Sequence, residues 1–102
     1  MTQEEAQAKL DEFRVRIDAI DKNIVELLNE RTRVVEEIGR VKGAAQLPIY
    51  EPKREDQVFA NISACNQGPI TATGLRSIFE RIIDEMRTIQ RLRMAAKQGD
   101  KK

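Results

Sequence analysis

Residues 4–42 read EEAQAKLDEFRVRIDAIDKNIVELLNERTRVVEEIGRVK, and this stretch decides the fold. It holds no proline and only one glycine, Gly39. Its apolar residues recur at alternating steps of three and four, at Leu10, Phe13, Ile17, Ile20, Ile24, Leu27, Val34, Ile38 and Val41. This spacing places them on one face of a helix, in a heptad-like seam. The stretch therefore predicts one long helix, which Gly43 ends at the C′ position with Pro48 beyond it.

Two shorter helices are expected after a loop at residues 43–50. Glu51 and Pro52 read as the N-cap and first residue of the second helix, and the breaker NQGP at residues 66–69 ends it. Thr71 or Thr73 then caps the third helix. The apolar faces of these helices contain Val58, Phe59, Ile62 and Cys65, and Leu75, Ile78, Phe79, Ile82, Ile83, Met86 and Ile89. The sequence predicts one all-α domain at residues 1–102, with its core at 8–92 and a frayed tail at 95–102.

The length of the first helix predicts a dimer. A helix of about 38 residues is about 57 Å long, whereas a compact domain of about 100 residues has a radius of gyration of about 13 Å. Two short helices from the same chain cannot cover the whole seam. Because most homo-oligomers are two-fold dimers, we expect an intertwined homodimeric helical bundle in which the long helices of two protomers pack along each other.

The charged residues are numerous but balanced, with 18 Lys and Arg against 17 Asp and Glu and a net charge of +1. Mixed charges of this kind are typical of solvated helix faces. They give no reason to expect a nucleic acid or membrane partner. The first residues, MTQEEAQAKL, include acids and no apolar run, so they form neither a signal peptide nor a transmembrane start. We therefore expect a cytoplasmic protein.

The chain has one cysteine and no histidine. Cys65 has no partner for an internal disulfide, and we expect it to be a small core residue. The lack of histidine excludes His-based triads and removes the commonest metal ligand. Any chemistry must therefore use Arg, Lys, Glu, Asp and Gln.

Arg31 stands where the alternation predicts an apolar residue, between Leu27 and Val34. Because burying an unpaired guanidinium is costly, Arg31 must reach water, pair with a carboxylate or face a polar pocket. Lys42 follows about 16 Å along the helix and about 20° around it, so both cations project from the same face. Together they can bracket a small dianion. A lone seam charge that sets helix register is the alternative for Arg31.

Four further polar residues are less distinctive. Glu51, Arg54 and Glu55 lie at i, i+3 and i+4 on the first turn of the second helix, a spacing that is also common in surface salt-bridge sets. Gln90 lies near the inner edge of the apolar stripe of the third helix. It is either a buried amide with partners or a residue at the rim.

Arg14 is too far from Arg31 to share a ligand with it on the same helix. The two residues are about 26 Å apart along the helix axis and about 100° apart around it. If both are functional, Arg14 must serve the pocket of the other protomer. An antiparallel arrangement of the two long helices allows this.

Five ordered motifs resemble the all-helical (AroQ-type) chorismate mutases over residues 8–92. They are Arg14-x2-Ile17-x2-Ile20-Asp21, Leu27-Leu28-Asn29-Glu30-Arg31, Ile38-Gly39-x2-Lys42, Pro48-Ile49-Tyr50-Glu51-Pro52-x-Arg54-Glu55, and the late Gln90. The resemblance implies two protomers that entwine through their first helices. It also implies two pockets, each of which converts chorismate to prephenate by a Claisen rearrangement in aromatic amino acid biosynthesis.

The resemblance further implies the roles of four side chains. Arg31 would bind the enolpyruvyl carboxylate, and the partner's Arg14 would bind a carboxylate from the far side. Lys42 and Gln90 would hydrogen-bond the ether oxygen, where negative charge builds as the C–O bond breaks. A pericyclic step needs no nucleophile, proton shuttle, metal or cofactor, because it needs only a folded dianion held next to fixed cations.

The resemblance places the ring hydroxyl of the substrate near the second helix. Glu55 and the region of Glu51 would hold this hydroxyl, with Arg54 as a supporting charge. Two positions depart from the pattern: Met86 stands where several relatives have a small hydroxyl residue, and Glu51 replaces the commoner Asp. Neither departure affects the two cations expected nearest the breaking bond.

Two alternative functions stay open. An isochorismate pyruvate-lyase resembles this fold and eliminates pyruvate through a related cationic pocket. A non-catalytic helical regulatory or interaction module would use Arg31 and Lys42 only as seam and surface charges. Association with another enzyme of the shikimate pathway is a further expectation, because some relatives associate in this way.

Overall fold

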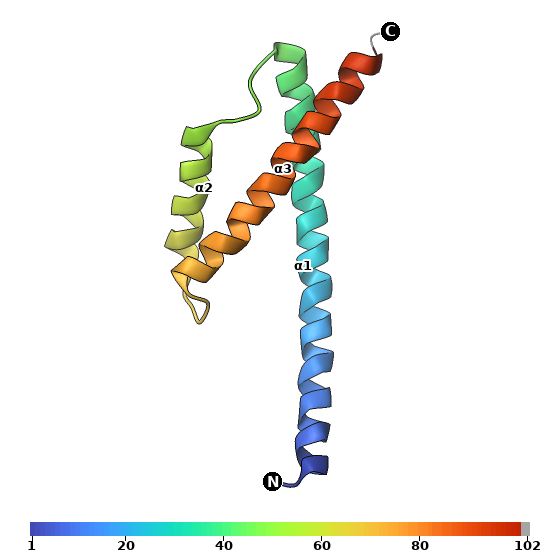
Figure 1. Cartoon of the computed structure of the whole chain (residues 1–102), viewed down its shortest axis with the longest axis vertical. Coiled ribbons are helices and arrows are strands. Elements are labelled where there is room, and N and C mark those ends of the chain that lie inside the picture. Colours follow the sequence, from blue (N-terminus) through green and yellow to red (C-terminus); the bar gives the residue numbers. More distant parts are fainter. Residues whose placement is uncertain (101–102) are drawn as a thin grey trace. The chain divides into compact units, whose positions relative to one another are not determined.

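The structure is a computed structural model that describes the backbone of residues 1–100 and the side chains of residues 1–95. Its described part is all-helical, with α1 (Gln3–Ala45), α2 (Pro52–Cys65) and α3 (Ala72–Asp100) in chain order and no strand (Figure 1). This confirms the prediction of one long and two shorter helices. Contacts divide the chain into two compact units, Met1–Arg33 and Val34–Lys102.

The ends of α1 are satisfied by local hydrogen bonds. At the start, the backbone N–H of Glu5 donates to Thr2 Oγ1 at 3.1 Å, as in an N-cap. At the end, Leu47 N donates to Lys42 O at 2.8 Å and Gln46 N to Gly43 O at 3.4 Å. These two bonds form a Schellman motif, in which Gln46 with φ 58° occupies the left-handed C′ position.

The prediction that Gly43 ends the first helix is therefore wrong. Gly43 lies inside α1, which continues to Ala45. A Cβ on Gly43 would lie 3.3 Å from Cγ of Met94 on α3. Gly43 therefore lies next to a side chain of α3 and has no left-handed backbone conformation.

The starts of α2 and α3 agree with the sequence. Glu51 is the N-cap residue of α2 and Pro52 its first residue, as expected. Of the two candidate caps for α3, Thr71 is the one used, because its Oγ1 accepts from Gly74 N at 3.0 Å. Cys65, which was expected in the core, is exposed. It is the last residue of α2, and its Sγ lies 3.5 Å from the Ile62 carbonyl oxygen of its own helix.

The core of the unit Val34–Lys102 forms where the end of α1 meets α3. Its buried apolar side chains are Val35, Ile83 and Met86, each 6% exposed. On α1, Val35, Gly39 and Lys42 are the buried residues, and their i, i+4, i+7 spacing makes them one helix face. The predicted seam is a different face, since Val34, Ile38 and Val41 are exposed.

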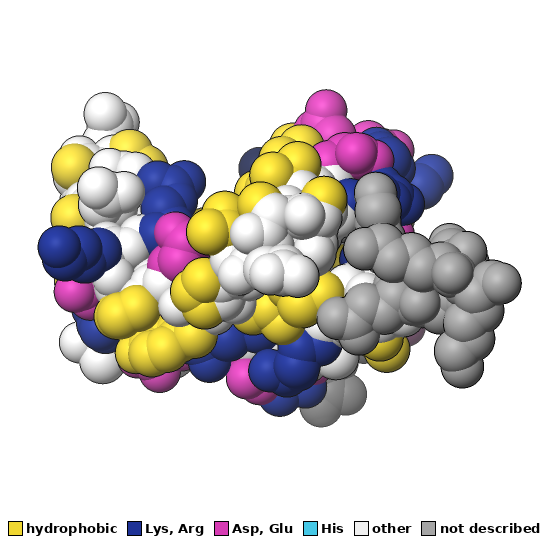
Figure 2. Space-filling model, turned by 90° about the horizontal axis from the view of Figure 1, so that it is seen from above, with side chains coloured by type: hydrophobic (Ala, Val, Ile, Leu, Met, Phe, Trp, Pro, Cys, Tyr) yellow, Lys and Arg dark blue, Asp and Glu magenta, His cyan; other side chains and the backbone are white. Residues whose placement is uncertain are grey.

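The seam of the first unit, Met1–Arg33, is also exposed, from Leu10 to Leu27. Figure 2 shows hydrophobic side chains at the molecular surface beside both basic and acidic ones.

None of the helices in the described part has a stretch long and apolar enough to cross a membrane. The frayed tail expected at 95–102 stays a prediction: α3 continues to Asp100, whereas residues 101 and 102 and the side chains after residue 95 lie outside the description.

Candidate active site

Lys42 is a buried cation with three oxygen partners. The residue is 7% exposed, and it is the only buried charged residue in the described part of the chain. Its Nζ lies 2.9 Å from each of three acceptors, which are the Ile49 carbonyl oxygen, Gln90 Oε1 and Glu51 Oε1. An ammonium group has three protons to donate. All three are therefore engaged, which offsets the cost of removing the charge from water.

The contact with Lys42 fixes the orientation of the Gln90 amide. Because an ammonium can only donate, Gln90 must present its Oε1 to Lys42, at 2.9 Å. Its Nε2 group then points away from Lys42 and keeps two protons to donate. The pair thus offers an ammonium and an amide N–H side by side. Gln90 was expected to be either a buried amide with partners or a residue at the rim; it is half-buried and has Lys42 as a partner.

Gly39 allows α3 to come close enough for this contact. A Cβ at residue 39 would lie 3.2 Å from both the Cα and the carbonyl oxygen of Gln90, and 3.3 Å from Cβ of Arg93. These are tight distances to atoms of a helix, which have little freedom to move. The lack of a side chain on Gly39 therefore sets the spacing between α1 and α3 at the level of Gln90.

Glu51 connects the start of α2 to Lys42. Its carboxylate lies 2.9 Å from Lys42 Nζ, and its side chain is 48% exposed against 9% for that of Lys42. Such an exposed carboxylate contributes modest Coulomb energy, since water screens it. The carbonyl of Ile49 binds Lys42 as well, so the loop before α2 is held at two points.

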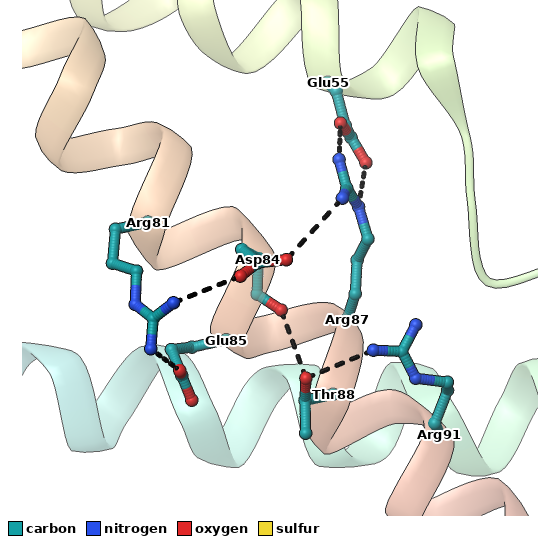
Figure 3. A network of polar contacts seen from close by, with 7 residues as sticks. All are labelled: Glu55, Arg81, Asp84, Glu85, Arg87, Thr88 and Arg91. Atoms are coloured by element: carbon teal, nitrogen blue, oxygen red, sulfur yellow. Dashed lines mark hydrogen bonds and ion pairs between the residues drawn. The ribbon is translucent and has the colours of Figure 1, made fainter.

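Glu55, one turn further along α2, is held by Arg87 of α3 (Figure 3). Arg87 Nε donates to Glu55 Oε2 at 2.8 Å, and Arg87 Nη2 donates to Glu55 Oε1. The hydrogen bonding to Glu55 raises the pKa of the Arg87 guanidinium above its usual range, more than partial burial lowers it. The two side chains form a bidentate pair that joins α2 to α3.

The remaining predicted site residues are Arg54, Arg14 and Arg31. Arg54 donates to Gln57 Oε1 at 3.4 Å on the exposed side of α2. Arg14 and Arg31 belong to the unit Met1–Arg33. Arg14 is exposed, with Nη1 3.7 Å from Asp11 Oδ1, and Arg31 is half-buried. The proposed roles of these three arginines stay predictions.

Arg87 is the residue that sequence reasoning missed. It follows Met86, which belongs to the apolar stripe of α3, and it precedes Gln90 by three residues. This spacing puts Arg87 at the edge of the face that carries Gln90. An arginine at the edge of an apolar stripe is usually solvated. The sequence of α3 alone therefore does not show that Arg87 pairs with Glu55 of another helix.

Fold and geometry define a class of small all-helical proteins with an ammonium and an amide side by side in a polar cluster between helices. Such a site can bind an anion and stabilise negative charge on an oxygen atom. In the described part, no group of three or more acidic or cysteine side chains is placed to hold a metal ion.

Residues 13–91 match the sequence profile of the family described as chorismate mutase type II, and the chain belongs to this family. A relative from Aquifex aeolicus, named bifunctional chorismate mutase/prephenate dehydratase, is 35% identical over 91% of this chain. This chain spans 27% of the length of that relative.

Two solved structures are similar along most of their length. Chorismate mutase (form II) from Thermus thermophilus has a TM-score of 0.79 and 34% identity, covering 81% of this chain and 94% of that one. Chorismate mutase from Helicobacter pylori in complex with prephenate has a TM-score of 0.79 and 25% identity, covering 86% of this chain and 96% of that one. The fold is thus shared with chorismate mutases of comparable size.

Proposed function

We propose that this chain is an isomerase that converts chorismate to prephenate by a Claisen rearrangement. Family membership supports this reaction. The observation that carries the proposal is the buried Lys42 ammonium held against the Gln90 amide. The Helicobacter pylori neighbour, whose structure contains prephenate, supports the same substrate class.

In this reaction the C–O bond between the ring and the enolpyruvyl group breaks while a new C–C bond forms. Negative charge builds on the ether oxygen as its bond breaks. Lys42 and the Nε2 group of Gln90 would both donate to this oxygen. Because these contacts strengthen in the transition state, they would raise kcat. Holding the substrate in its folded conformation supplies the rest of the acceleration.

Substrate binding must change the contacts of Lys42, whose three protons are already engaged. The ether oxygen therefore replaces one of the three acceptors. Glu51 is the partner that yields in our proposal, because its half-exposed carboxylate can be solvated after release. Gln90 and the Ile49 carbonyl would then keep Lys42 in place.

The other side chains would bind the periphery of the substrate. Arg31 and the partner's Arg14 would bind its two carboxylates. Glu55, with the region of Glu51, would accept a hydrogen bond from its ring hydroxyl, and Arg54 would be a supporting charge.

The dimer is the second part of the proposal. It is supported by the seam of α1, whose nine apolar residues from Leu10 to Val41 are all 40–62% exposed. Contiguous apolar surface of this kind marks an interaction site. We propose that two copies of the chain cover each other's seams in an intertwined homodimer, and that residues 1–102 act as one chorismate mutase domain in it.

One experiment separates the proposed reaction from its alternatives. Purified protein without added cofactor is incubated with chorismate, and the loss of chorismate and the formation of prephenate are followed. Release of pyruvate from isochorismate, without prephenate from chorismate, would instead identify a pyruvate-lyase. Failure to bind a bicyclic dicarboxylate that mimics the transition state would leave a non-catalytic helical module.

An association with another enzyme of the shikimate pathway also belongs to the proposal. It is supported by the Aquifex aeolicus relative, whose name joins chorismate mutase to prephenate dehydratase. A cytoplasmic location stays a prediction as well. Co-purification of the native protein with a prephenate-consuming activity, from the cytoplasmic fraction, tests both.

A further inference from the structure

Arg87 of α3 donates two hydrogen bonds to the carboxylate of Glu55 of α2 (Figure 3). Neither side chain is freely solvated, since Arg87 is 32% and Glu55 19% exposed. The Arg87 guanidinium also lies 5.3 Å from the centre of the Tyr50 ring and 3.9 Å from Asp84 Oδ1. Contacts on several sides leave it little freedom to rotate.

The geometry of the pair leaves Glu55 able to accept further hydrogen bonds. Arg87 uses one lone pair on each carboxylate oxygen, through Nε to Oε2 and through Nη2 to Oε1. Each carboxylate oxygen has about two lone pairs. The remaining lone pairs can accept a hydrogen bond from a hydroxyl, and the guanidinium fixes the plane of the carboxylate.

The Arg87–Glu55 pair lies one helical turn from the residues that contact Lys42, on both α2 and α3. On α2, Glu55 N donates to the carbonyl of Glu51, whose carboxylate contacts Lys42. On α3, Arg87 lies one turn before Gln90, which contacts the same ammonium. Glu51 and Gln90 thus hold Lys42, and the residues one turn away from them, Glu55 and Arg87, hold each other.

We propose that Arg87 is a positioning residue that orients the Glu55 carboxylate to accept the ring hydroxyl of the substrate, and thereby sets the selectivity for a hydroxylated ring. This inference rests on the proposed function, which assigns the hydroxyl to Glu55. It goes beyond that assignment, because it makes the selectivity depend on a residue of α3 that does not touch the substrate.

Arg93 provides a matched control for an ordinary interhelical ion pair. Like Arg87, it belongs to α3 and binds a glutamate of another helix, here Glu36 of α1, although both its Nε and its Nη2 contact the same oxygen, Oε2. The two glutamates are equally exposed, at 19%. A purely structural role for Arg87 predicts that Arg87→Gln and Arg93→Gln act alike.

The test measures calorimetric affinities of the full chain for two probes, the bicyclic dicarboxylate that mimics the transition state and the same compound without its ring hydroxyl. We expect Arg87→Gln to weaken binding of the hydroxylated probe about ten-fold or more and binding of the other probe about two-fold or less. Arg87→Lys keeps the positive charge but cannot make the two parallel hydrogen bonds of a guanidinium. Its loss of selectivity should therefore be intermediate. Arg93→Gln should leave the ratio of the two affinities unchanged.

Equal weakening of both probes in folded Arg87→Gln, or no weakening, overturns the inference and leaves the proposed function intact. If Arg87→Gln does not fold, Arg87→Lys decides: an affinity ratio equal to that of the unaltered protein overturns the inference, and a reduced ratio supports it. Failure of the unaltered protein to bind the hydroxylated probe overturns the proposed function and the inference together.

Discussion

Lys42 has a structural function and a proposed catalytic function, and removal of its side chain should affect both. Its ammonium holds the Ile49 carbonyl, Glu51 and Gln90, and in the proposed reaction it also stabilises the ether oxygen. We expect Lys42→Ala to lower kcat by about 100-fold or more. The free energy of unfolding should also fall by about 1–3 kcal/mol, because the Ile49 carbonyl and Gln90 lose a charged hydrogen-bond donor. Steady-state kinetics and urea unfolding measure the two effects.

The control for this prediction is Lys53→Ala, since Lys53 is exposed on the first turn of α2. It should change neither quantity appreciably. If Lys42→Ala keeps full activity, the assignment of the ammonium to the ether oxygen is wrong. If only the stability changes, Lys42 is a structural cation.

Gln90 should make the reaction insensitive to alkaline pH, because a neutral amide does not titrate. Replacement by glutamate would place a carboxyl next to the Lys42 ammonium, where Gln90 Oε1 now lies at 2.9 Å. A nearby cation lowers the pKa of a carboxyl group. The protonated form, which alone can donate to the ether oxygen, is therefore present only at low pH. We expect the activity of Gln90→Glu to fall as pH rises, in a range where unaltered protein stays active.

The pH profiles of kcat for both proteins check this prediction. Identical profiles would contradict the proposed role of the Gln90 amide. Gln57→Glu, on the exposed side of α2, is the control. That variant should keep the profile of the unaltered protein.

At the residue scale, the sequence pointed to the residues that interrupt an apolar pattern but not to their partners. Arg31 could be singled out because it interrupts the apolar seam, Lys42 because it shares a helix face with Arg31, and Gln90 because it lies near the edge of an apolar stripe. The contact between Lys42 and Gln90 joins residues 48 positions apart in the chain, which no periodicity reports. Arg87 was missed for the same reason, since its significance depends on Glu55, 32 residues away.

At the scale of the helices, two glycines of α1 should respond differently to the same substitution. Gly39→Ala brings a Cβ to 3.2 Å from backbone atoms of Gln90, which cannot yield without a shift of α3. Gly43→Ala brings one to 3.3 Å from Cγ of Met94, a flexible side chain that can rotate away. Alanine also favours the helix over glycine by about 0.5–1 kcal/mol.

We therefore expect Gly43→Ala to leave the free energy of unfolding unchanged or to raise it by up to about 1 kcal/mol. Gly39→Ala should lower it by about 1–3 kcal/mol, as overpacking does, and should lower kcat because Gln90 moves relative to Lys42. Urea unfolding and kinetics of both variants provide the comparison. Equal behaviour of the two variants would show that the close approach at Gly39 does not set the helix spacing.

The three helices themselves could be predicted, because long periodic segments and proline breakers are local signals. The end of α1 could not, since Gly43 looks like a C′ glycine in sequence and is recognised as a packing glycine only once α3 is next to it. The second buried face of α1 was also missed. It consists of Val35, Gly39 and Lys42, and a row that contains a glycine and a lysine has no hydrophobic periodicity to detect.

At the scale of the whole molecule, the sequence and the structure of one chain both indicate that the seam of α1 is an interaction surface. The seam was predicted from its three-four alternation, and its residues are exposed in both units of the chain. A second copy is proposed as its cover. The same dimer would let Arg14 of one chain and Lys42 of the other serve one pocket, because two long helices that pack antiparallel would bring residues near the start of one helix close to residues near the end of the other.

Mixed dimers test the shared pocket directly. If every pocket combines Arg14 of one protomer with Lys42 of the other, the Arg14→Ala and Lys42→Ala homodimers both lose most of their activity. In a mixed dimer both defects fall into one pocket, and the other pocket is intact. Random reassortment of equal amounts makes about half of the dimers mixed, so about a quarter of all pockets are intact by two-fold symmetry.

Co-refolding the two variants should therefore restore about a quarter of the activity of the unaltered protein. Mixing them without subunit exchange should restore none, which is the control for carry-over of active material. Because each homodimer carries its defect in both pockets, no rescue can arise unless a pocket draws on two chains. Co-refolded protein that contains verified heterodimers, but has only the residual activity of its parents, would contradict the shared pocket. Arg14 would then act elsewhere, and the dimer would be needed only to cover the seam of α1.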